Sequence, residues 1–350
     1  MPATDPAVCT SRRRMLDAIH FAHPDKIPVV YHPSTAGLFV HGERLLDLLR
    51  AFPPDNDITF AGLPAPPPAT IDAQGRYHEL SRDTWGVEWE YLIFGIAGHP
   101  HAYPLPSWEA GRGYRFPPLP SADPAAFARM KAETAAKRAT YLVQGGGVSI
   151  FERLHALRPM DELLMDLATG DRHALAFLDR LVDYWHAVIA DLIELGVDMV
   201  MFGDDWGTQT APLISPRLFR NVFMPRYAAL FEPLRRAGKI IFFHSCGYLG
   251  PTFDMLLELG IDGLWPQIGL YEQIPNVIQR CRDARVTLYI HPDRQRLIPL
   301  GTPAEIDAAI RAYADRYHAL GGGGIFYVEI ENDAPWQNVR ALIEAIHRYR

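Results

Sequence analysis

The residues with the clearest capacity for chemistry are a histidine and a cysteine two positions apart, in the stretch KIIFFHSCGYLGP at residues 239–251. The apolar run before them predicts a buried strand, and residues i and i+2 of a strand point to the same side. His244 and Cys246 are therefore able to bind one metal ion, because Zn²⁺ prefers nitrogen and sulfur ligands. Gly247 allows a sharp turn beside them. The structural alternative is a small buried cysteine and a satisfied core histidine.

A zinc site needs at least one further protein ligand. Glu329, in IFYVEIEN, lies at the end of a predicted late strand, and a carboxylate oxygen is an acceptable ligand. Glu331 lies on the same face, two residues farther along. Cys281 falls in a predicted helix just before a strand, so we interpret it as structural, and Cys9 lies near the N-terminus.

From about residue 140, short apolar runs alternate with amphipathic stretches that predict helices. Continuous apolar runs are typical of strands buried on both faces, and alternation with helices predicts parallel pairing. We therefore predict an α/β fold, a single (β/α)8 barrel with an N-terminal extension. The runs lie at residues 140–147, 196–205, 239–247, 261–269, 285–293 and 324–332.

Each run ends in polar residues, and a (β/α)8 barrel gathers such strand ends on one rim, where barrels of this kind hold their active sites. The alternative is that loops are polar in general. Besides His244, Cys246 and Glu329, the polar residues at these ends include Gln144, Asp204, Asp205, Gln267, His291 and Asp293. We select Asp204, Asp205, Gln267 and His291 as catalytic candidates, with capping or loop solvation as the alternative for Asp205.

Residues 1–130 are less regular and rich in proline. They contain an early predicted strand, KIPVVYHPS at 26–34, and a tryptophan-rich stretch at 83–105. We interpret this part as an N-terminal extension that covers the barrel mouth, together with the first barrel elements. Residues 131–350 then supply the regular βα units of one domain spanning 1–350.

Composition excludes several classes of function. A net charge of −7 and an isoelectric point near 6.0 argue against nucleic acid as a partner, because phosphate binding needs clustered Lys and Arg. No window approaches the roughly 20 apolar residues that cross a bilayer, and the N-terminus has no apolar signal core. Three cysteines are too few for a disulfide framework. These features predict a cytoplasmic protein that does not bind membranes.

An ordered set of motifs resembles the uroporphyrinogen decarboxylase superfamily, in its branch of zinc-dependent corrinoid and coenzyme M methyltransferases. The segments GDDWGTQTAPLISPRLF, HSCG, HPDRQRLIPLGTPAEI and GGGGIFYVEIENDAPWQNVRALIEAI carry the resemblance, with DAIHFAHPDKIPV like the family's opening. The resemblance implies zinc bound by His244 and Cys246. The family's third ligand is usually a cysteine shortly before a Thr-Pro-x-x-Asn motif. Here Ala334, Pro335 and Asn338 occupy that motif, no cysteine lies near it, and Glu329 stands at almost the same offset.

The predicted function is methyl transfer between a corrinoid protein and a small-molecule acceptor or donor. Either zinc activates the acceptor, or zinc or a carboxylate activates the methylated donor in the reverse direction. Decarboxylation of a polycarboxylate porphyrinogen is disfavoured, because no arginine lies between Arg14 and Arg44, where the decarboxylase has an arginine-containing signature. One alternative is a decarboxylase or lyase for a smaller carboxylate, held by Arg153, Arg294 or another arginine. The other is a catalytically silent barrel that binds a ligand or a corrinoid protein. A homo-oligomer is compatible with each of these.

Overall fold

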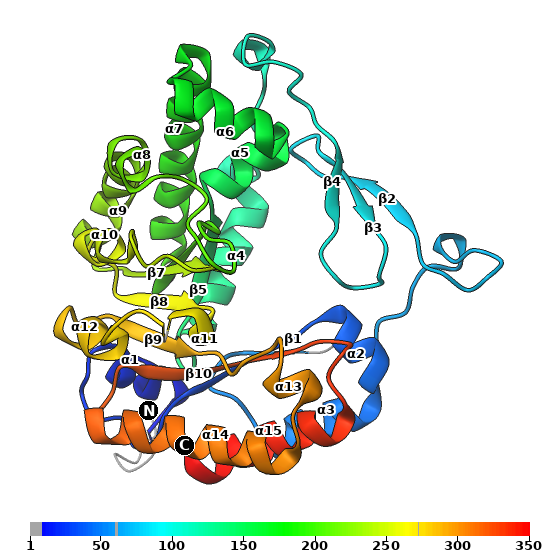
Figure 1. Cartoon of the computed structure of the whole chain (residues 1–350), viewed down its shortest axis with the longest axis vertical. Helices are drawn as coiled ribbons and strands as arrows, with labels where there is room; N and C mark the ends of the chain where they lie inside the picture. Colours follow the sequence, from blue (N-terminus) through cyan, green and yellow to red (C-terminus); the bar gives the residue numbers. More distant parts are fainter. Residues whose placement is uncertain (1–8, 60–61, 272) are drawn as a thin grey trace. The chain divides into compact units, whose positions relative to one another are not determined.

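A computed structural model describes residues 9–59, 62–271 and 273–350 (Figure 1). The chain forms two compact units. Unit 1 consists of residues 1–64, 135–143 and 262–350, and unit 2 consists of residues 65–134 and 144–261.

Unit 1 contains four parallel strands, which neighbour one another in the order β1-β10-β9-β8. Their bounds are β1 Val29–Pro33, β8 Gly263–Pro266, β9 Thr287–Ile290 and β10 Gly324–Ile330. All four residues of β9 are buried, as are six of the seven in β10. This burial agrees with the continuous apolar runs that predicted these strands.

The helices of unit 1 follow or precede these strands along the chain. They are α1 Ser11–Ile19, α2 Thr35–His41, α3 Glu43–Ala51, α11 Ile268–Tyr271, α12 Val277–Asp283, α13 Leu297–Leu300, α14 Pro303–Leu320 and α15 Trp336–Tyr349. The two longest, α14 and α15, pack side by side (Figure 1, orange and red). Helix α14 begins with a capping box in which the Thr302 and Glu305 side chains bond each other's backbone N–H, and it ends at Gly321 in the left-handed conformation.

Unit 2 contains three parallel strands in the order β7-β6-β5. Their bounds are β5 Gln144–Val148, β6 Met199–Gly203 and β7 Ile240–Ser245. Gln144 begins β5 and is exposed, so the expectation that it ends a strand is wrong. The reason is that Gly145, Gly146 and Gly147, which suggested a loop, extend the strand instead.

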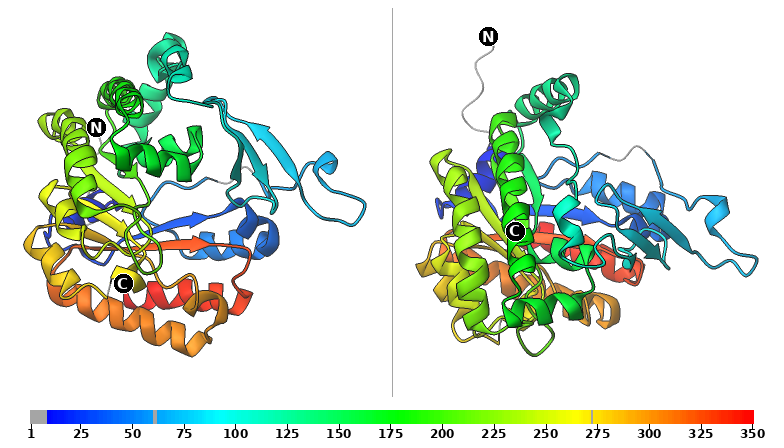
Figure 2. Two further views of the ribbon diagram at one scale, coloured as in Figure 1. Left: turned by 45° about the horizontal axis from the view of Figure 1, so that its top comes forward. Right: turned by 90° about the horizontal axis from the view of Figure 1, so that it is seen from above.

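The helices of unit 2 include the longest of the chain, α7, which lies beside α9 (Figure 2, green). They are α4 Pro124–Lys137, which runs on into unit 1, α5 Phe151–Leu157, α6 Met160–Thr169, α7 Arg172–Leu195, α8 Pro216–Leu218, α9 Met224–Arg236 and α10 Phe253–Glu258, with short 3-10 turns at Pro68–Thr70, Ala110–Gly113 and Pro120–Ala122. The helical segment that begins after Ser215 is capped by the Ser215 side chain. A π-helical turn at Phe219–Phe223 interrupts it before Pro225, which lacks the N–H for a regular turn.

The tryptophan-rich stretch at 83–105 and the four residues before it form an antiparallel sheet that the sequence did not predict. Its strands β2 Glu79–Arg82, β3 Glu88–Tyr91 and β4 His99–Ala102 pair in that order (Figure 2, cyan). Each strand is only four residues long and half-exposed, so it lacks the continuous apolar run by which the other strands were recognised. This part of the predicted N-terminal extension is therefore a small β-sheet.

The parallel α/β fold is confirmed, and every predicted strand from 26–34 to 324–332 is present. Within the described ranges there are seven parallel strands, so the eighth strand of a closed barrel stays a prediction, as does a single domain over 1–350. No helix in the described part of the chain combines the length and the apolar character needed to span a bilayer.

Candidate metal centre

Strand β7 presents both residues of the predicted ligand pair. His244 is its penultimate residue and Cys246 follows its end. The two side chains lie on the same side, with Cys246 Sγ 3.5 Å from His244 Nε2. The i, i+2 geometry expected from the sequence is therefore present.

Asp205 completes a three-residue cluster with them. It follows β6, and because Gly203 pairs with His244 across the β6–β7 ladder, the residues after the two strands meet. Asp205 Oδ1 accepts a hydrogen bond from the Cys246 backbone N–H at 2.7 Å and lies 3.3 Å from His244 Nε2. Nitrogen, sulfur and carboxylate ligand atoms thus lie within 4.8 Å of one another. This donor set fits Zn²⁺, which binds all three atom types.

The cluster is only partly exposed, and its members interact electrostatically. The His244 side chain is 20% exposed and the Asp205 side chain 41%. Burial by itself lowers the pKa of His244, but hydrogen bonds with Asp205 and Cys246 outweigh it and raise the pKa to about 10. A metal ion at this position replaces the imidazole proton, because histidine binds metals in its neutral form.

The loops after β6 and β7 approach each other closely at two glycines. Gly247 has a φ of +79°, and a Cβ added there would lie 1.9 Å from the carbonyl oxygen of Gly207. The turn predicted at Gly247 therefore serves two purposes. It reverses the chain after Cys246, and it leaves room for the loop that carries Asp205.

Asp204 lies next to Asp205 but is completely buried. Its carboxylate accepts hydrogen bonds from the backbone N–H groups of Ile150 and Glu152, at 2.9 and 2.8 Å, and from the Tyr227 hydroxyl at 2.5 Å. Burial raises the pKa of Asp204 to about 7, although these three donors act in the opposite direction. The side chain therefore joins the end of β6 to the start of α5 and to α9.

Two residues that the sequence analysis did not select also support the cluster. Glu152 Oε1 accepts a hydrogen bond from the Asp205 N–H at 3.3 Å, and Ser245 Oγ accepts one from the Trp206 N–H at 3.1 Å. Both contacts join residues about 40 to 50 positions apart, so no local pattern indicates them. Glu152 also contacts His155 Nε2 at 2.7 Å.

The remaining candidates Glu329 and His291 lie together in unit 1. Glu329 Oε2 accepts a hydrogen bond from Arg294 Nη1 at 2.8 Å and lies 3.5 Å from His291 Nε2. The Trp265 indole donates to His291 Nδ1 at 3.2 Å, so in the neutral ring Nε2 carries the proton. The described residues that gather around a potential metal position do not include Glu329. Its role as a ligand stays a prediction.

Three other predicted positions have plain structural settings. Gln267 directly follows β8 and is partly exposed. Asp293 accepts hydrogen bonds from the backbone N–H groups of Gln295 and Arg296, which is a capping role. Cys281 lies in α12 and is 1% exposed, as a structural cysteine should be, and burial raises its pKa to about 12.

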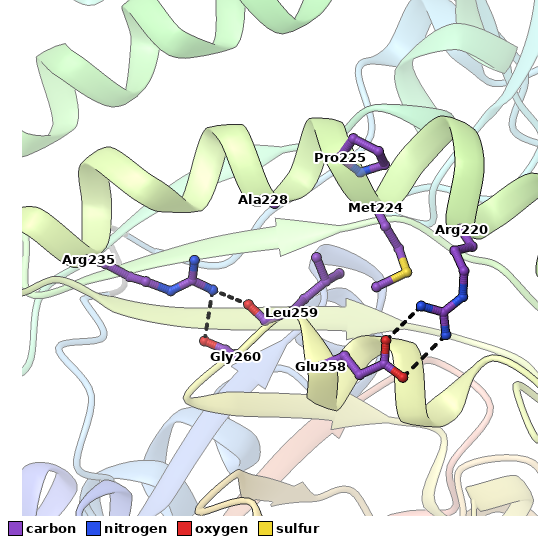
Figure 3. A pocket seen from close by; sticks show the side chains of 8 residues that line it. All are labelled: Arg220, Met224, Pro225, Ala228, Arg235, Glu258, Leu259 and Gly260. Carbon is purple, nitrogen blue, oxygen red and sulfur yellow. Dashed lines mark hydrogen bonds and ion pairs between the residues drawn. The ribbon is translucent and has the colours of Figure 1, made fainter.

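A shallow groove of about 550 Å³ lies between the π-helical turn, α9 and the end of α10 (Figure 3). Its charged groups are paired: Arg220 forms two hydrogen bonds with Glu258, and Arg235 donates to the carbonyls of Leu259 and Gly260. None of the metal-cluster residues lines it. The groove is therefore a contact between helices and not part of the candidate site.

Comparison with solved structures shows the fold independently. A methyltransferase from Methanosarcina mazei superposes with a TM-score of 0.62 at 18% sequence identity, over 98% of this chain and 99% of that one. The apo form of the 3-keto-D-glucoside 4-epimerase YcjR from E. coli matches 59% of this chain and 97% of that one, at 12% identity and a TM-score of 0.34. Comparison with curated proteins finds no match.

The model of the family described as "Uroporphyrinogen decarboxylase (URO-D)" matches residues 133–349, more than half of the 350 residues. The match includes β5 to β10, and with them Asp205, His244 and Cys246. This confirms, for the family, the resemblance seen in the sequence motifs. The chain belongs to the uroporphyrinogen decarboxylase family.

Proposed function

We propose that this protein is a zinc-dependent methyltransferase that moves a methyl group between a corrinoid protein and a small acceptor or donor. The proposal is based on one observation: the ligand atoms of Asp205, His244 and Cys246 all lie within 4.8 Å of one another. Three protein ligands that leave a fourth position open are typical of catalytic zinc sites. The activity named for the similarly folded M. mazei protein is the reason for choosing methyl transfer.

Zinc bound by these residues would act as a Lewis acid that lowers the pKa of a substrate thiol, so that the thiol would be a nucleophile at neutral pH. The chain's own residues set up the zinc position. His244 and Cys246 present nitrogen and sulfur from one strand end, and the Cys246 N–H orients the Asp205 carboxylate. Asp204 acts as a positioning residue, because it is buried and holds α5 against the end of β6.

Asp205 is our choice for the third ligand, and Glu329 is the alternative. The reason is the partner of each carboxylate: Asp205 accepts from a backbone N–H and faces His244, whose imidazole gives up its proton when it binds a metal, whereas Glu329 is paired with the Arg294 guanidinium, which stays charged. A guanidinium competes with a metal ion for the same oxygen. His291 and Gln267 stay predictions from the sequence.

The test is zinc content by elemental analysis, combined with demethylation of free methylcobalamin by a panel of small thiols, followed by absorbance. We expect about one zinc per chain and thiol-dependent demethylation that a chelator abolishes. Cys246→Ala should lose both the metal and the activity, and Cys281→Ser should keep both.

A protein that contains no zinc and transfers no methyl group would overturn the proposal. If that protein also decarboxylated a small acid, the lyase alternative would replace it. Zinc retained in full by both Cys246→Ala and His244→Ala would place the metal elsewhere.

A further inference from the structure

We propose that Arg153 binds a carboxylate of the substrate while the metal centre binds the sulfur that gains or loses the methyl group. The substrate class is then a small thiol or thioether that also carries a carboxylate. This inference rests on the proposed function, which it deepens by naming that class. It is carried by the setting of Arg153, which lies in unit 2 together with the metal cluster.

Arg153 is fixed close to the cluster by its neighbours in the chain. It lies in the first turn of α5, whose start is held by the bonds from the Ile150 and Glu152 N–H groups to Asp204. The adjacent Glu152 side chain accepts a hydrogen bond from the Asp205 N–H. The same contacts that place the proposed ligand Asp205 therefore also place Arg153.

The guanidinium of Arg153 is held flat and partly accessible. Its central carbon lies 4.3 Å from the centre of the Trp85 ring, an arrangement that stabilises the cation and orients its plane. The side chain is 21% exposed. A stacked guanidinium of this kind can bind a planar carboxylate with two hydrogen bonds, donated by its two Nη groups.

The donors of Arg153 are poorly used by the protein. Its Nε is buried and has no hydrogen-bond partner among the residues that the structure describes. The carboxylate of Asp83 lies 3.7 Å from Nη1, which is beyond hydrogen-bond distance. The Asp83 oxygens already accept bonds from the N–H groups of Trp85 and Val87 and from the Trp89 indole. A buried cation with an unsatisfied donor is costly, and burial accordingly lowers the pKa of Arg153.

Arg180, in the same unit, shows what a structural arginine looks like here. It also lies over aromatic rings, at 5.4 Å from Phe116 and 5.7 Å from Phe177. Its Nη1 and Nη2, however, donate to the carbonyls of Gly111 and Tyr114 at 2.5 and 2.8 Å. Aromatic stacking is common to both arginines, and the unsatisfied donor distinguishes Arg153.

The experiment compares two probes of equal chain length, 3-mercaptopropionate and 3-mercapto-1-propanol, on the Co²⁺-loaded protein. Binding of each thiol is followed by the thiolate-to-cobalt absorption band. We expect 3-mercaptopropionate to bind about 10- to 100-fold more tightly, since hydrogen bonds to a charged group are worth about 1.5–3 kcal/mol. Arg153→Gln should abolish this preference, Arg153→Lys should reduce it, and Arg180→Gln should leave it intact.

Circular dichroism checks that each variant is folded, and Arg153→Lys retains the cation if Arg153→Gln does not fold. Equal affinity for the two probes in the wild type, or a preference that survives in Arg153→Gln and Arg153→Lys, would overturn the inference.

Calorimetric titration of both probes into the metal-free protein separates this inference from the metal centre. If the protein takes up no Co²⁺ but still binds the carboxylate probe in a way that depends on Arg153, the anion site stands and the metal centre is overturned. Co²⁺ uptake with equal affinity for both probes would do the reverse. A protein that neither takes up Co²⁺ nor prefers 3-mercaptopropionate would overturn both the metal centre and the anion site.

Discussion

The two units each place a histidine and a carboxylate together at strand ends, but they give the carboxylate different partners. In unit 2, Asp205 accepts a hydrogen bond from the backbone N–H of Cys246 and faces His244. In unit 1, Glu329 faces His291 and forms an ion pair with Arg294. A backbone N–H orients a carboxylate without neutralising it, and the His244 imidazole loses its proton when it binds a metal, whereas a guanidinium keeps its charge and stays paired. The availability of a carboxylate for a metal therefore depends on its partner and not on its position at a strand end.

The thiol is the second difference between the two units. In the unit 2 cluster, the neighbour of His244 is the thiol of Cys246. In unit 1, the neighbour of His291 is the indole of Trp265, which donates a hydrogen bond to it. Zinc binds thiolate and imidazole strongly, and an indole N–H does not ligate metals. We therefore propose the unit 2 cluster, rather than the unit 1 set, as the metal centre.

The largest expected effect is loss of the metal in Cys246→Ala. Removing one of three protein ligands should lower zinc affinity by more than about 100-fold, because even residues that only support a ligand contribute about 10- to 100-fold. Zinc affinity measured by competition with a chromophoric chelator checks this. Cys281→Ser is the matched control, and an equal loss there would contradict the assignment.

The next effect is on folding, in Asp204→Asn. The amide cannot accept from all three of the groups that Asp204 now satisfies, so we expect a loss of at least about 2 kcal/mol in the free energy of unfolding. Urea denaturation measures it. Tyr227→Phe removes only one of the three donors to Asp204. Its loss in the free energy of unfolding should therefore be about 1 kcal/mol smaller than that of Asp204→Asn. Equal stability of Asp204→Asn and the wild type would exclude the positioning role.

The comparison of the two carboxylates is tested directly by Asp205→Asn and Glu329→Gln. An amide oxygen is a poorer zinc ligand than a carboxylate, so Asp205→Asn should lower zinc affinity about 10-fold, while Glu329→Gln leaves it unchanged. The reverse result would make Glu329 the third ligand, as the family offset suggested. Glu331→Gln serves as the control for a neighbouring carboxylate.

The smallest expected effect is that of Glu329→Gln on stability. It removes an ion pair whose arginine is 41% exposed, and such pairs contribute about 1 kcal/mol or less. Thermal unfolding at low and high salt should therefore differ little between Glu329→Gln and the wild type. A loss several times larger would show that the pair holds the end of β10 together.

Local sequence was enough to predict where the parallel strands lie along the chain, because most of them contain a run of apolar residues. Strand β5 is an exception, since it consists of Gln144, three glycines and Val148. Local sequence also placed His244 and Cys246 on one side of a strand, since that depends only on the two-residue repeat of strand geometry. The sheet β2–β4 was missed because its short, half-exposed strands carry no such pattern.

The third member of the metal cluster was decided only by tertiary structure. Sequence reasoning selected both Asp205 and Glu329 as strand-end carboxylates, with Glu329 preferred as the ligand. The pairing of Gly203 with His244 brings Asp205 to Cys246 across 41 positions of the chain, and the fold around β10 brings Arg294 to Glu329. Strand register and the partner of a charged group depend on contacts between distant segments, whereas periodicity and residue type are properties of one segment alone.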